Sequence, residues 1–338
     1  MEVPMRVIGL AVVLAVSLVL APLAAGAQLA GKTARMGSLV FGPVESPEEQ
    51  ARRSTAPLWQ AMRDLGWVVG QNIVVERRYG ESADQLRAAA ADLVRLKVDV
   101  LLAPSADLAE LLQRETKTIP IVVVGAGSDL VAAGLVASLG KPGGNLTGTQ
   151  VLNSDLIPKK LELLQALIPN LSRIAFLTED VSVLPQTYVE QDRSLTAAAR
   201  TLGLNVHTVV VHEPGEFAAA FLRITKNRDQ GLLVLGSPFS IRHRKQIVEL
   251  AAKHRIVAIY ENEVSAEAGG LMSYAANREE IAHRQAVIVD KILRGAKPAD
   301  LPVEQPTKFK LAINLKTAKA LGLTIRPSLL GRADRVIQ

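Results

Sequence analysis

Cysteine is absent from the 338-residue chain. Without a thiol, the sequence cannot form a disulfide, a thiolate metal site or a cysteine-linked lipid anchor. Aromatic residues make up only 4% of the chain and charged residues 21%, whereas hydrophobic residues reach 49%. This composition fits a globular α/β protein and excludes a disordered one. The length is sufficient for two domains.

Motifs of catalysis and cofactor binding are also scarce. None of the five histidines forms an H-x-x-x-H or H-E-x-x-H pair, and no Walker motif or G-x-S-x-G elbow occurs. Gly125-Ala126-Gly127 follows an apolar run, but the third glycine of the dinucleotide fingerprint is missing. We therefore expect a binding protein with no cofactor and no metal. A nicotinamide-dependent enzyme is the weaker alternative.

Positive charge exceeds negative charge, with a formal net charge of +6. The basic residues are scattered among acidic ones, so the excess indicates a solvated surface and not a nucleic-acid interface.

The N-terminal segment differs from the rest of the chain. Arg6 precedes the apolar run "VIGLAVVLAVSLVL", and the small-residue site Ala25-Gly26-Ala27 follows it. This order predicts a signal peptide over residues 1–27, cleaved after Ala27, and hence a periplasmic protein. An uncleaved N-terminal anchor is the alternative. Later apolar runs are too short to span a bilayer, which needs about 20 residues.

Short β-branched runs alternate with longer helical patterns along the remaining chain. This alternation predicts βαβ units and parallel sheets covered on both faces. The turn-rich segment Leu139–Gln150 and the proline-rich segment 295–315 divide the pattern. We expect two Rossmann-like lobes joined by hinge crossovers. The N-terminal lobe would comprise residues 33–148 plus about 270–302, and the C-terminal lobe 149–269 plus about 303–338. Pro57 predicts a kinked or restarted helix near Ser54-Thr55.

Several segments of the chain closely resemble one family. They are "DLVRLKVDVLLA", "TIPIVVVG", "KPGGNLTG", "GGLMSYA", "IVDKILRGAKPADLPVEQPTKF" and "LAINLKTAKALGLTIRPSLLGRADRVIQ". The family is the ABC-transporter substrate-binding proteins of the tryptophan- and tyrosine-uptake type. The resemblance implies a type I periplasmic-binding-protein fold that delivers a small solute to a membrane permease. Known members favour aromatic amino acids or related small acids.

Polar residues stand where several predicted strands end and helices begin. Backbone N–H groups at a helix start are unpaired and carry a partial positive charge, so they can hold a carboxylate. Ser46, Ser105, Ser128 and Ser237 occupy such positions, with Ala106 beside Ser105. Capping of their own helices is an equally good interpretation of these serines. Their occurrence in both predicted lobes favours a shared ligand.

Acidic and aromatic candidates complete the predicted site. Asp129 and Glu261 follow apolar strands and could bind a ligand's ammonium group, although Asp129 could equally cap a helix. Tyr188, Phe239 and Tyr260 lie near predicted strand ends and could contact a planar ligand.

The preferred hypothesis is an extracytoplasmic solute receptor of an ABC importer. Its two lobes would close over a small amino acid or aromatic carboxylate and pass it to an inner-membrane permease. We expect a monomer that binds no nucleic acid. The alternative is a periplasmic sensory subunit for a receptor kinase or chemoreceptor.

Overall fold

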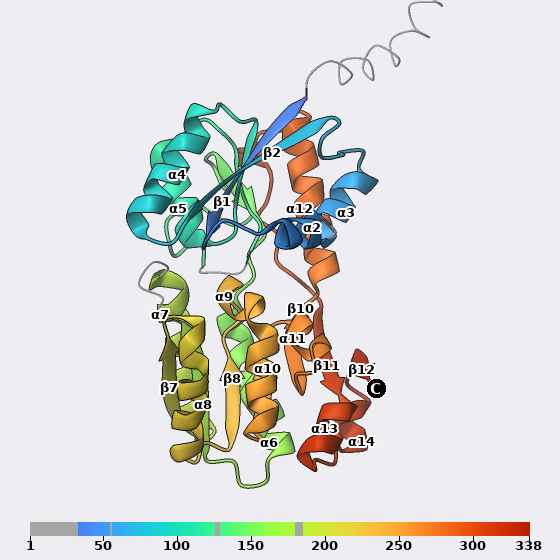
Figure 1. The fold of residues 1–338 in the computed structure, drawn as a ribbon. Coiled ribbons are helices and arrows are strands. Elements are labelled where there is room, and N and C mark those ends of the chain that lie inside the picture. The colour runs from blue at the N-terminus through green and yellow to red at the C-terminus, as the bar shows by residue number, and fades with distance from the viewer. Residues whose placement is uncertain (1–32, 55, 126–128, 180–184) are drawn as a thin grey trace, which may run out of the picture.

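The computed structural model describes residues 33–54, 56–125, 129–179 and 185–338. They form two α/β lobes, one above the other in Figure 1. The predicted residues 1–27 of the signal peptide and Ser128 lie outside the described residues. Within the described part, no helix combines the length and the apolar character needed to span a membrane.

The first lobe is built on a five-stranded parallel sheet with the order β2-β1-β3-β4-β5. Apolar side chains fill both faces, one under α4 and α5 and the other under α3 and α12. The elements are β1 (Ala34–Phe41), β2 (Ile73–Gly80), β3 (Val100–Ala103), β4 (Ile121–Val123), β5 (Leu146–Gly148), α2 (Pro47–Ser54), α3 (Pro57–Asp64), α4 (Ala83–Arg95), α5 (Ala106–Glu115), α12 (Arg278–Leu293) and the 3-10 helix η3 (Pro298–Asp300).

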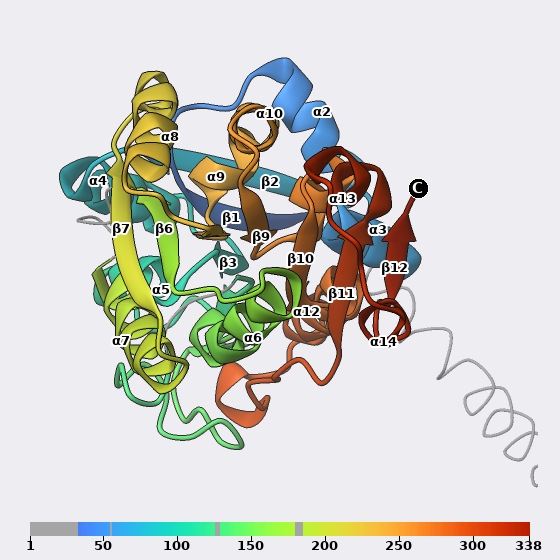
Figure 2. The same cartoon turned by 90° about the horizontal axis from the view of Figure 1, so that it is seen from below.

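The second lobe holds a seven-stranded sheet with the order β12-β11-β10-β9-β8-β6-β7, parallel except where β11 pairs with β10. Figure 2 shows α6 and α7 on one side of this sheet and α8 and α10 on the other. The strands are β6 (Arg173–Glu179), β7 (Asn205–Val211), β8 (Gly231–Val234), β9 (Val257–Tyr260), β10 (Met272–Ala276), β11 (Phe309–Asn314) and β12 (Arg335–Ile337). The helices are η1 (Asn153–Leu156), α6 (Ile157–Leu167), α7 (Pro185–Thr201), η2 (Pro214–Glu216), α8 (Phe217–Lys226), α9 (Pro238–Arg242), α10 (Arg244–Lys253), α11 (Glu263–Glu267), α13 (Leu315–Leu321) and α14 (Pro327–Leu330).

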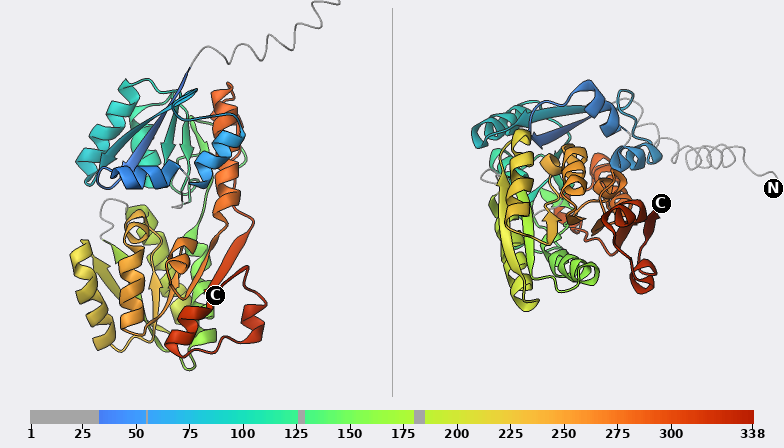
Figure 3. Two further views of the ribbon diagram at one scale, coloured as in Figure 1. Left: turned by 45° about the vertical axis from the view of Figure 1, so that its right-hand side comes forward. Right: turned by 60° about the horizontal axis from the view of Figure 1, so that its bottom comes forward.

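The chain passes between the lobes after β5, after β10 and before β11, and Figure 3 shows α12 and the segment after it beside these crossings. Backbone hydrogen bonds join the first and third crossings, where Gln150 N donates to Glu304 O. A boundary at about residue 270 would put β10 in the N-terminal lobe, but β10 hydrogen-bonds to β9 and β11 of the second sheet. The sheet pairing therefore moves this boundary to Asn277, which caps α12.

The local signals at Pro57 and at the helix caps agree with the structure. α2 ends at Ser54, and α3 starts anew with Pro57 at its first position. Proline is tolerated there because the backbone N–H at this position has no partner within the helix. The side chain of Asn277 accepts from the backbone N–H groups of Glu279 and Glu280. Gly295 follows α12 with φ 99°, a left-handed conformation that favours glycine.

Candidate functional site

The carboxyl ends of the parallel strands in one lobe face those of the other lobe, and the lobes touch there (Figure 3). Nε of Arg242 on α9 lies 3.0 Å from Oε1 of Glu49 on α2. On the other side of the junction, the backbone N–H of Asp129 donates to Oε1 of Glu190 on α7, at 3.3 Å. Ligands of open α/β sheets bind at this edge. The junction is therefore the candidate site.

The first-lobe candidates stand at this edge mostly as helix caps. Ser46 forms a reciprocal capping box with Glu49: its Oγ accepts from Glu49 N at 3.2 Å, and its own N–H donates to the Glu49 carboxylate at 2.8 Å. Ser105 caps α5 by accepting from Leu108 N at 3.3 Å, and Ala106 is buried in the core beneath. The Asp129 carboxylate accepts from the N–H groups of the two residues at 131 and 132. The capping interpretation accounts for the contacts of Ser46 and Ser105, whereas the Asp129 carboxylate closes a turn, because the described residues between β4 and β5 form no helix.

Two second-lobe candidates, Ser237 and Phe239, lie together at the start of α9. The Ser237 hydroxyl caps the helix by accepting from Ser240 N at 3.1 Å and donates to a Glu179 carboxylate oxygen at 2.6 Å. The Phe239 ring makes tilted contacts with the rings of Phe217 and His243, whose centroids are 5.5 and 4.9 Å away. These residues form one polar and aromatic cluster at the ends of β6 and β8.

Three other second-lobe candidates lie in or against the core of their lobe. Glu261 forms a fully buried ion pair with Lys160 of α6, at 2.6 Å, so its charge is already balanced without a ligand's ammonium group. The ring of Tyr260 is 1% exposed and belongs to the core between the sheet and α8 and α10. Tyr188 packs half-buried against the core on the α6 and α7 side.

Sequence reasoning missed Glu179, the last residue of β6. It is 8% exposed, and burial raises the pKa of its carboxyl from 4.5 to about 7, with the Ser237 hydrogen bond opposing the rise. Two buried polar atoms have no hydrogen-bond partner among the described residues: Gln191 Oε1 on α7 and Asn262 Nδ2, two residues after β9. The available signal was an acid that ends an apolar strand, "RIAFLTE", but it does not reveal burial.

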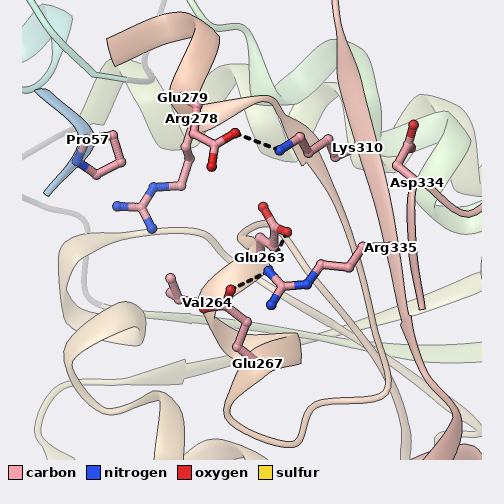
Figure 4. A pocket seen from close by; sticks show the side chains of 9 residues that line it. All are labelled: Pro57, Glu263, Val264, Glu267, Arg278, Glu279, Lys310, Asp334 and Arg335. Atoms are coloured by element: carbon pink, nitrogen blue, oxygen red, sulfur yellow. Dashed lines mark hydrogen bonds and ion pairs between the residues drawn. The ribbon is translucent and has the colours of Figure 1, made fainter. Parts of the chain in front are cut away.

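A hollow of about 300 Å3 lies apart from this cluster, where the chain crosses between the lobes (Figure 4). Its lining is mainly charged, and most of the charges pair with one another. Lys310 Nζ lies 3.2 Å from Glu279, and Arg335 Nη1 lies 2.9 Å from Glu263. Because most of these charges are paired, the strand-end cluster is the stronger candidate for ligand binding. Within the described residues, no group of three or more metal-ligating side chains gathers.

Comparison with known proteins decides the family. Residues 40–337 match the family described as "ABC transporter substrate binding protein". The chain belongs to this family. The family consists of binding proteins and not of enzymes, which confirms the prediction of a non-catalytic protein.

Individual relatives agree with this family membership. The chain is 28% identical over 265 residues to the "Tyrosine-binding protein" of Clostridioides difficile (strain R20291), covering 78% of this chain and 75% of that one. It resembles the solved "ABC domain in complex with L-Trp" from Streptococcus pneumonia, at 26% identity and TM-score 0.75, covering 90% and 100% of the two chains. A conserved domain protein from Vibrio cholerae has the same fold, at 24% identity and TM-score 0.77, with the same coverage of 90% and 100%. The predicted type I periplasmic-binding-protein fold is confirmed.

Proposed function

We propose that this protein is the extracytoplasmic substrate-binding component of an ABC importer and that its lobes close over a small amino acid or aromatic carboxylate. The observation that carries the proposal is the polar cluster at the facing strand ends. The Ser105 hydroxyl and the α5 start lie on one side, and Ser237 with Glu179 lies on the other. An amino acid carries a carboxylate, which a helix start attracts, and an ammonium group, which an acid attracts.

The relatives support an aromatic amino acid as the solute. One relative is named for tyrosine, and one solved structure holds L-Trp. Micromolar affinity requires about −8 kcal/mol. Charge-assisted hydrogen bonds of about 1.5–3 kcal/mol each, with one buried ring, are sufficient for this affinity.

The arrangement of the lobes supports a closing motion. The chain matches the L-Trp complex with TM-score 0.75 but the "ligand-free, open structure of CD0873" from Clostridium difficile with TM-score only 0.59. The two identities, 26% and 25%, are nearly equal, so sequence divergence does not explain the difference. The contact between Arg242 and Glu49 is consistent with a closed state. A ligand shifts the lobes toward closure only if it binds the closed state more tightly.

The partners follow from the same proposal. The predicted signal peptide over residues 1–27 would export the protein to the periplasm, where the closed form would meet an inner-membrane permease. We expect the monomer to be the binding unit, because one chain supplies both halves of the junction.

Ligand binding and closure can be measured separately. Calorimetry with L-tyrosine, L-tryptophan, L-phenylalanine and benzoate would identify the solute class.

Because the chain has no cysteine, the double variant Arg87→Cys with Leu222→Cys can be spin-labelled specifically at one exposed position in each lobe. We expect the bound solute to shorten the label distance. The pair Leu222→Cys with Glu249→Cys, within the second lobe, is the matched control and should not change. A solute that binds without altering the cross-lobe distance would refute closure, and no binding by any of the four compounds would refute an aromatic solute.

A further inference from the structure

Glu179 differs from the other buried acids of the second lobe because no basic side chain among the described residues pairs with it. Glu261 has Lys160 as its counter-ion at 2.6 Å, and Asp229 lies 2.8 Å from the His207 ring. Within the described part of the chain, the Glu179 carboxylate meets only the Ser237 hydroxyl. The sequence of residues 180–184, Asp-Val-Ser-Val-Leu, also contains no basic residue. A buried carboxylate without a cation is strongly unfavourable when ionised.

We propose that Glu179 binds the ammonium group of the solute and so makes the protein selective for amino acids over carboxylic acids. This inference rests on the proposed function, because it names the residue that reads one end of the amino acid. It also replaces Glu261, whose charge Lys160 already balances. The ligand would supply the positive charge that the described residues around Glu179 do not provide.

The surroundings of Glu179 suit a small cation. A cavity of about 10 Å3 lies beside the carboxylate, near the lower limit for one water-sized group. The hydroxyls of Ser237 and Ser240 and the rings of Phe217 and Phe239 line it. Hydroxyl oxygens accept hydrogen bonds from an ammonium group, and aromatic faces attract a cation. The ionised Glu179 carboxylate would repel an anionic group in the same cavity.

The cavity also lies on the ligand side of the second lobe. It sits at the carboxyl ends of β6 and β8 beneath α9. α9 carries Arg242, which reaches Glu49 of the first lobe. An ammonium group beside Glu179 would therefore leave the rest of the solute at the junction of the lobes.

Binding should be linked to proton release. Burial raises the pKa of Glu179 to about 7, so about half of the free protein is protonated there at pH 7. An ammonium group favours the ionised carboxylate, so binding at pH 7 should release about half a proton. The basic groups on neighbouring elements interact with groups other than Glu179. Arg242 pairs with Glu49, and His212 after β7 pairs with Glu216. Arg223 of α8 and Arg244 of α10 donate to the backbone oxygens of Val210 and Ile241, and the His243 ring contacts Phe239.

The test compares each amino acid with its analogue that lacks the amino group. Titration calorimetry at pH 8 would use L-tyrosine with 3-(4-hydroxyphenyl)propanoate and L-tryptophan with indole-3-propanoate. We expect the wild type to bind the amino acid at least about 30-fold more tightly than the analogue. Glu179→Gln should weaken amino-acid binding by about 30- to 100-fold and change analogue binding by less than about threefold. The control Glu249→Gln, at an exposed position on α10, should change neither.

The wild type alone gives an independent readout if Glu179→Gln does not fold. Calorimetry at pH 7 in buffers of different ionisation enthalpy should report the release of about half a proton with the amino acid and none with the analogue. Equal affinity for both compounds, or amino-acid binding without proton release, would overturn the role of Glu179 and leave the proposed function standing. If the wild type binds none of the four aromatic compounds named under the proposed function, the aromatic solute class fails, and this inference fails with it.

Discussion

Glu179 ends β6 with 8% of its surface exposed, so Glu179→Gln removes a buried negative charge and keeps the shape of the side chain. The amide oxygen of glutamine can still accept the hydrogen bond that Ser237 donates at 2.6 Å. The variant should therefore report mainly on the free energy of burying the charge, measured in the ligand-free protein.

The magnitude follows from the pKa of the carboxyl, which burial raises from 4.5 to about 7. This difference corresponds to about 3 kcal/mol. Below pH 4.5 the group is protonated in both the folded and the unfolded state. Between pH 4.5 and 7 the folded state retains a proton that the unfolded state has released, so the stability of the wild type falls as the pH rises. Above pH 7 the loss is complete.

The assay is urea denaturation of ligand-free protein at pH 5 and pH 8. We expect Glu179→Gln to be about 2–3 kcal/mol more stable than the wild type at pH 8 and within about 1 kcal/mol of it at pH 5. Both tryptophans, Trp59 and Trp67, lie in the first-lobe core, so their fluorescence reports that lobe, whereas circular dichroism reports both. If the lobes unfold separately, only the dichroism transition should shift. A variant less stable than the wild type at pH 8, or an effect equal at the two pH values, would refute an unpaired buried charge.

Three further substitutions test the ion pairs and the core of the second lobe. Lys160→Met leaves Glu261 buried without its counter-ion, and we expect a loss of about 3–5 kcal/mol in the free energy of unfolding, measured by urea denaturation. Tyr260→Phe removes a buried hydroxyl that has no hydrogen-bond partner in the described part of the chain, so the same measurement should show no loss and a gain of up to about 1 kcal/mol. Arg242→Met removes the contact with Glu49 between two side chains that are each 28% exposed, and calorimetry should show solute affinity reduced by about two- to fivefold.

Local signals in the sequence were sufficient for the architecture. The alternation of apolar runs and helical patterns predicts two lobes, and Pro57 predicts the restart of the helix. Both predictions succeed because strand and helix formation and the effect of proline depend on neighbouring residues. The partner of Glu261 could not be predicted in this way. Lys160 is 101 positions away and meets Glu261 only because α6 packs over β9. The sequence also could not show which face of the sheet the Tyr260 side chain points to. A strand covered on both faces is apolar on both, so its pattern does not distinguish a core-facing residue from one that contacts a ligand.

Unpaired polar atoms near the junction give a physical reason why closure would require a solute. In the described arrangement, Gln191 Oε1 and Asn262 Nδ2 are buried without hydrogen bonds. Gln191 belongs to α7, which contacts α5 of the first lobe. A buried polar atom without a partner destabilises a state by about 1–3 kcal/mol, whereas water satisfies the same atom in an open state. Under the proposed closing motion, an empty closed form would therefore be disfavoured by about 2–6 kcal/mol, and a solute that pairs with these two atoms would gain this difference in the closed form alone. This difference would be the differential affinity by which a ligand shifts the population of the lobes.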